Sequence, residues 1–146
     1  MENRLNMLAL QPDAYKAMYS LEGFLKNSQL SKVHKELIKM RASQINGCAY
    51  CLDMHSKEAL KTGETVERLI LLSAWKESNL FTAEEKIILA LTEAVTLIHN
   101  EGINAELYKR AEETFGQVYL AQIIMAIVTI NGWNRIAVST HMQPGQ

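Results

Sequence analysis

The chain has 146 residues, a length that fits one domain, and we expect residues 1–146 to form a single domain. It carries 15 basic and 16 acidic side chains, and a net charge of −1 provides no positive surface for nucleic acid or for an anionic membrane. The N-terminus has no basic region followed by a long apolar run, and the longest apolar run, residues 123–128, is far shorter than the ~20 residues of a membrane span. We therefore expect a soluble, cytoplasmic protein with no nucleic-acid or membrane partner.

Apolar residues recur at helical spacing along most of the chain. Residues 1–11 are the exception, and we expect them to form a loosely held arm. We predict helices at about residues 12–27, 31–46, 48–62, 65–77, 82–99, 104–116 and 118–139. No segment of useful length alternates with the two-residue period of a β-strand. The predicted fold class is therefore all-α, with six or seven helices.

Local signals predict several of the helix ends. Ser31 and Asn104 stand where N-caps are expected, because their side-chain oxygens can accept a free backbone N–H group of the first turn. Thr82 is followed three residues later by Glu85, which is the capping-box pattern. Gly47 can take the left-handed conformation that closes a helix.

The last predicted helix is unusually apolar. Between Ile123 and Ile130 it is apolar on most sides, and such a helix is normally buried all round. In a small domain this pattern predicts either a central helix or a helix that a partner subunit covers.

Both cysteines of the chain lie within residues 36–55, ELIKMRASQINGCAYCLDMH. Two residues separate Cys48 from Cys51, His55 follows four positions later, and Glu36 precedes Cys48 by twelve. A reducing cytosol opens ordinary disulfides, so a C-x-x-C pair in a cytosolic chain favours transient redox chemistry or metal binding.

Helix geometry relates these side chains to one another. Cys48, Cys51 and His55 fall at positions i, i+3 and i+7, which lie on one face of a helix. The positive end of the helix dipole favours a thiolate and by itself would favour Cys48. His55, one turn from Cys51, is placed to act as a base for that thiol, and Glu36 is placed to orient His55.

Two other interpretations of the pair remain open. The cysteines could be two small buried apolar side chains in the core. They could also bind zinc together with His55, with His34 or Glu36 as a fourth ligand. Structural zinc prefers four ligands, however, and the sequence has no second cysteine pair.

Glu36 followed by Cys48-x-x-Cys51-x-x-x-His55, in the setting RASQINGCAYCLDMH, resembles the alkylhydroperoxidase D-like family of the carboxymuconolactone decarboxylase superfamily. The segment NGWNR, residues 131–135, resembles the C-terminal signature of that family. The twenty-residue motif is highly specific, whereas the C-terminal signature is supportive.

The resemblance covers roughly residues 12–141 and implies a six- to seven-helix alkylhydroperoxidase D-like bundle that assembles into trimers or hexamers. This agrees with the apolar last helix. It also implies a thiol peroxidase in antioxidant defence, in which a hydroperoxide is reduced and the cysteine pair becomes a disulfide. The reductant would be a dithiol donor of thioredoxin-like or lipoyl type, with no metal and no cofactor.

The resemblance also implies a role for each motif residue. Cys51 matches the cysteine that attacks the peroxide, and Cys48 matches its disulfide partner. His55 and Glu36 match the proton relay that deprotonates the attacking thiol. The true decarboxylase branch of the superfamily lacks this cysteine pair, which argues against lactone decarboxylation.

One position departs from the family pattern. Well-studied members carry a histidine just before the second cysteine, where this chain has Tyr50. We therefore expect a different contact with substrate or reductant and weaker peroxidase activity. This leaves open a second function, a disulfide oxidoreductase or redox-sensing module without efficient peroxidase turnover.

The remaining candidate residues receive structural interpretations. His34, His99 and His141 are expected to be solvated or to make local polar contacts. Trp133 is expected either in the core or in the wall of an active-site pocket or subunit interface. Arg135 is expected at the surface.

Overall fold

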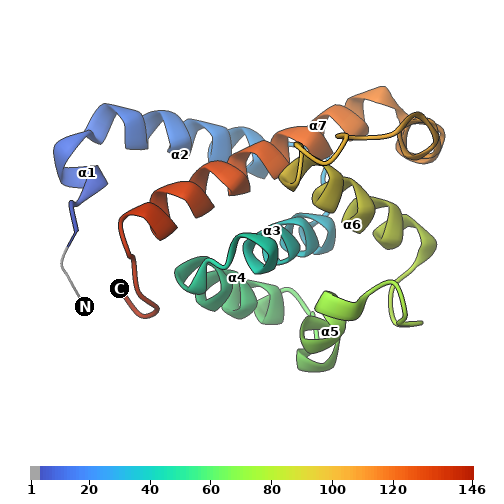
Figure 1. Ribbon diagram of the computed structural model, residues 1–146, viewed down its shortest axis with the longest axis horizontal. Coiled ribbons are helices and arrows are strands. Elements are labelled where there is room, and N and C mark those ends of the chain that lie inside the picture. The colour runs from blue at the N-terminus through green and yellow to red at the C-terminus, as the bar shows by residue number, and fades with distance from the viewer. Residues whose placement is uncertain (1–3) are drawn as a thin grey trace.

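The computed structural model describes residues 4–146, which form seven α-helices and one short 3-10 helix and contain no strand (Figure 1). The all-α prediction is therefore confirmed. The elements are α1 (Met7–Leu10), α2 (Pro12–Lys26), α3 (Lys32–Asn46), α4 (Ala49–Lys61), α5 (Val66–Leu71), η1 (Leu72–Ala74), α6 (Ala83–Thr96) and α7 (Ala105–Ser139).

The predicted helix ends are confirmed where local chemistry sets them. Ser31 caps α3 by accepting the backbone N–H of His34. Thr82 and Glu85 form the complete capping box of α6, with each side chain accepting the other residue's backbone N–H. Gly47 closes α3 in the left-handed conformation, with φ of 65°, which is a backbone conformation that glycine adopts without steric cost.

The helix predicted at 65–77 is shorter than expected. Regular α5 ends at Leu71, and the chain tightens into η1 before Trp75. Trp75 is buried, and its indole N–H donates to Glu93 of α6 at 2.7 Å. Local periodicity continues through Trp75, but this tertiary contact draws the side chain away from the path of a continued helix.

Part of the expected N-terminal arm is ordered against the end of the chain. Residues 1–3 lie outside the described residues, whereas Met7–Leu10 form α1. The guanidinium of Arg4 donates to the backbone oxygen of Ser139 at 2.9 Å. The first described residues and the C-terminal segment consequently lie on one side of the molecule (Figure 1).

The helix that carries the core is interrupted once. At Gly116, φ is 76° and ψ is 164°, which is non-helical backbone inside α7. The two helices predicted at 104–116 and 118–139 are therefore present, joined at this residue. By length and composition α7 could cross a membrane, but core helices of soluble proteins pass the same test, and 33% of its most apolar window is buried.

The main core lies where α3, α6 and the second half of α7 meet. Ile88, Ile123 and Ile127 are fully buried there. Val118 and Val128 on α7 are exposed by 62% and 46%, so α7 is a central helix with one uncovered edge. Whether a second subunit covers that edge remains a prediction.

Candidate active site

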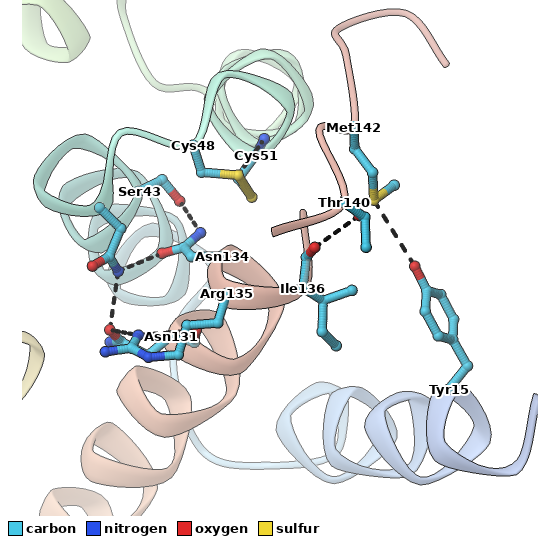
Figure 2. The surroundings of a disulfide bond; sticks show 11 residues. Tyr15, Ser43, Cys48, Cys51, Asn131, Asn134, Arg135, Ile136, Thr140 and Met142 are labelled. Carbon is cyan, nitrogen blue, oxygen red and sulfur yellow. Dashed lines mark hydrogen bonds between the residues drawn. A yellow bond between two sulfur atoms is a disulfide. The ribbon is translucent and has the colours of Figure 1, made fainter. Parts of the chain in front are cut away.

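The two cysteines are joined by a disulfide at the start of α4 (Figure 2). Cys48 is the N-cap of that helix, and its sulfur accepts the backbone N–H of Cys51 at 3.2 Å. Each cysteine is only 1% exposed. The expectation that Cys48 shares a helix face with His55 needs correction, because the helix begins at Ala49 and only Cys51 and His55 lie within it.

Glu36 and His55 are brought together as the motif predicts. The Oε2 atom of Glu36 on α3 lies 3.6 Å from Nδ1 of His55 on α4, and both side chains are largely buried. Neither atom has a hydrogen-bond partner. Buried polar atoms are nearly always paired in folded proteins, so this close but unbonded pair stands out.

A cavity of about 320 Å³ opens beside Cys51 and His55, and both residues line it. Cys48 does not line this cavity. Most of the wall is aromatic or sulfur-containing, contributed by Tyr15, Tyr19, Tyr50, Met54, Trp133 and Met142. Lys39 and Glu22 add charge at the wall. The cavity therefore presents one sulfur of the disulfide and one imidazole to an otherwise mostly apolar space.

Three aromatic rings from two helices form one side of the cavity. The rings of Tyr15 and Tyr19 on α2 lie 5.2 and 5.5 Å from that of Trp133 on α7. The indole N–H of Trp133 donates to Glu22 at 3.1 Å. Trp133 occupies both predicted positions, because it lines the cavity and also packs against the main core. Tyr15 and Tyr19 were not among the predicted site residues, although their four-residue spacing on one helix face indicated a shared surface.

The C-terminal segment closes another side of the site. Met142 packs against the cysteine pair together with Tyr50, and its sulfur lies 4.0 Å from the hydroxyl of Tyr15 (Figure 2). Burial and the neighbouring hydroxyls of Tyr19 and Tyr50 raise the pKa of Tyr15, so this hydroxyl stays protonated at neutral pH. A larger hollow of about 550 Å³ adjoins the cavity between the two chain ends.

Of the other histidines, His99 and His141 are exposed, as expected. His34 is half-buried and makes a polar contact, the other expected outcome, with Nδ1 2.6 Å from the hydroxyl of Tyr119 on α7. Burial lowers the pKa of His34, which keeps its ring neutral. Arg135 is exposed, as expected. Within residues 4–146, no three His, Cys, Asp or Glu side chains converge in a group that could hold a metal ion.

The chain is similar to known proteins both in sequence and in structure. The sequence profile of the carboxymuconolactone decarboxylase family matches residues 12–94. The uncharacterized protein YdfG of Bacillus subtilis is 39% identical over 139 residues, which cover 95% of each chain.

Two solved structures extend this comparison. A protein of unknown function from Agrobacterium tumefaciens, suggested to be an antioxidant defence protein AhpD, is 37% identical, with a TM-score of 0.95 over 99% of each chain. The debrominase Bmp8 shares the fold at 19% identity, with a TM-score of 0.83 over 94% of this chain and 74% of its own. The chain belongs to the carboxymuconolactone decarboxylase family, within its alkylhydroperoxidase D-like group.

Proposed function

We propose that the protein is a thiol-dependent peroxidase that reduces organic hydroperoxides with Cys48 and Cys51. One observation carries this proposal: Cys51 and His55 line the same apolar cavity, with Glu36 buried behind His55 at 3.6 Å. Membership of an enzyme family and the likeness to a suggested antioxidant defence protein support it.

The first step takes place in the reduced protein. His55 accepts the proton of the Cys51 thiol, and Glu36 stabilises the imidazolium that forms. The Cys51 thiolate attacks the terminal oxygen of the hydroperoxide and breaks the O–O bond. The sulfur becomes a sulfenic acid, and the alkoxide leaves as an alcohol after taking the proton that His55 holds.

The second step closes the disulfide. The Cys48 thiol attacks the sulfur of the Cys51 sulfenic acid, the S–S bond forms, and the oxygen leaves as water. The two residues are adjacent at the helix start, which favours this step over further oxidation of Cys51. A dithiol donor then reduces the disulfide by two thiol–disulfide exchanges and becomes oxidised itself.

The wall of the cavity favours an organic substrate over hydrogen peroxide. An apolar or aromatic group on the hydroperoxide would move out of water and into contact with Tyr19, Trp133 and Met54. We expect kcat/KM for cumene hydroperoxide to exceed that for hydrogen peroxide by about tenfold, corresponding to ~1.4 kcal/mol of binding. Trp133→Ala should remove most of this preference, whereas Trp133→Phe should retain it.

The direct test is steady-state peroxide consumption with a dithiol donor. Cys51→Ser should reduce consumption to background, because no thiolate is left beside His55. Cys48→Ser should still consume about one equivalent of peroxide but lose sustained turnover, because no resolving thiol remains. Full activity in both variants would contradict the proposal.

A second candidate function rests on Tyr50, which lines the cavity at the position where the resemblance to the alkylhydroperoxidase D-like family implies a histidine. In a redox sensor the same pair would be oxidised once and would signal through its disulfide. Counting free thiols after peroxide treatment, beside a turnover assay, separates the two functions. Loss of two thiols without turnover would favour the sensor.

A further inference from the structure

A network of one buried and two half-buried asparagine amides links the C-terminal signature to the end of α3 (Figure 2). Asn134 on α7 is 1% exposed, and its amide N–H donates to the hydroxyl of Ser43 at 3.0 Å. The amide of Asn46 donates to Asn134 at 2.9 Å and to Asn131 at 3.0 Å. Asn131 continues the network to Thr96 of α6 at 3.0 Å.

The network ends at Ser43, which is hydrogen-bonded to the backbone of Cys48. The backbone N–H of Cys48 donates to the carbonyl oxygen of Ser43 at 3.1 Å. Ser43 is fully buried, and Asn134 holds its hydroxyl. Only Gly47 separates Asn46 from Cys48, and its left-handed backbone turns the chain from the end of α3 toward the start of α4. The amides therefore restrain Ser43 and Asn46 on the α3 side of the turn, and the carbonyl oxygen of Ser43 in turn holds the backbone N–H of Cys48 at the start of α4.

We infer that Asn134 and Asn46 are positioning residues that hold Cys48 against Cys51 and so lower the reduction potential of the pair. The role in peroxide turnover rests on the proposed function, but the effect on the potential does not.

The physical reason is the effective concentration of one thiol toward the other. Cys48 precedes the first helical residue, so in the dithiol form its position depends on the turn and not on the hydrogen bonds of α4. A restrained turn has already lost the freedom that disulfide closure would otherwise remove. Closure is then more favourable, and the disulfide is harder to reduce.

This effect differs from a contribution to folding. An interaction that stabilises the disulfide and dithiol forms equally cancels from the equilibrium between them. A purely structural network would therefore leave the reduction potential unchanged, even if its removal lowered the free energy of unfolding.

The test is the reduction potential of the purified full-length protein in a glutathione or dithiothreitol redox buffer. We expect Asn134→Ala to lower the equilibrium constant for disulfide formation about tenfold, which raises the potential by about 30 mV. Asn46→Ala changes a less buried position and should shift the reduction potential in the same direction. If Asn134→Ala does not fold, the measurement on Asn46→Ala tests the inference.

Thr92→Val is the matched control. Thr92 is fully buried and bonds the carbonyl oxygen of Ile88 within α6, outside the network. The Thr92→Val variant should have a lower free energy of unfolding but an unchanged reduction potential. Equal potentials for the wild type and both asparagine variants would overturn the inference. Because no peroxide is used, that result is distinguishable from a failure of the proposed peroxidase activity.

Discussion

Two buried clusters of ionisable side chains in this protein are built in opposite ways. Arg68 of α5 pairs with Glu64 at 2.7 Å and with Glu85 at 2.9 Å, donates to the carbonyl oxygen of Leu80, and lies over the ring of Phe81. The hydrogen bond to Glu85 raises the pKa of Arg68. Every charge in this cluster is matched, as expected where an ion pair serves the fold.

Glu36 and His55 form the contrasting group. Their facing atoms are the only buried side-chain nitrogen and oxygen atoms within residues 4–146 that lack a hydrogen-bond partner. Unsatisfied buried polar atoms cost about 1–3 kcal/mol each, so selection for stability alone would remove them. Completeness of pairing therefore separates this structural ion-pair cluster from the Glu36–His55 pair, to which the proposed function gives the role of a proton relay.

The largest expected effect comes from His55→Gln. The rate at which peroxide oxidises the reduced protein should fall at least ~100-fold, because the proton acceptor for Cys51 is lost. The free energy of unfolding should change by less than about 1 kcal/mol, because no formed hydrogen bond is broken. Stopped-flow oxidation and urea unfolding measure the two effects, and a large loss of stability would remove the contrast with Arg68.

Arg68→Met should show the opposite profile. Two carboxylates would remain buried without their partner, and we expect a loss of about 3 kcal/mol in the free energy of unfolding. The oxidation rate at 25 °C should stay at the wild-type value, because Arg68 contacts no residue of the cavity. A parallel loss of activity in the folded variant would show that the two groups are coupled.

Tyr119→Phe extends the comparison to His34, a histidine that has a hydrogen-bond partner. The Tyr119 hydroxyl lies 2.6 Å from His34 and accepts the backbone N–H of Ser31 at 3.2 Å. Its removal should cost about 1 kcal/mol of stability and leave peroxide oxidation unchanged. Urea unfolding of this variant beside His55→Gln tests whether a satisfied histidine contributes to stability alone.

The smallest expected effect is a change in how stability depends on pH in acid. Burial is the largest single influence on the pKa of Glu85 and raises it, but the hydrogen bonds from Arg68 and from the backbone N–H of Thr82, together with the charge of Arg68, lower it by more, so this pKa lies below the ordinary value of 4.5. A depressed carboxyl pKa stabilises the fold above pH 4.5, and this contribution is lost as the pH falls through the lower, folded-state value. Arg68→Met should therefore show a shallower loss of stability below pH 4.5 than the wild type.

The sequence predicted the elements whose ends depend on neighbouring residues. Ser31, Thr82 and Gly47 act within one turn of their own positions, and each forms the predicted cap. Trp75 could not be predicted in the same way, because its partner Glu93 is eighteen residues away. Helical periodicity contains no information about such a contact.

In the candidate site, too, the contacts set by a local motif could be predicted from the sequence, and the contacts between distant segments could not. Glu36 and His55 were predicted to meet because the spacing of their motif relates two consecutive helices, and they do meet. Tyr15 and Met142 reach the site from the two ends of the chain, and no local pattern links them. The signature around Asn134 indicated that the end of α7 matters, but only the fold connects it to Ser43 and Cys48.

The position of Met142 has a consequence for how the protein is made. Met142 covers the cysteine pair, yet it follows Cys51 by 91 residues. At roughly 5–20 residues per second, synthesis of that stretch takes on the order of 5–20 s. During this interval both thiols exist without the wall that later covers them, so the growing chain depends on the reductants around it until its last helix has docked.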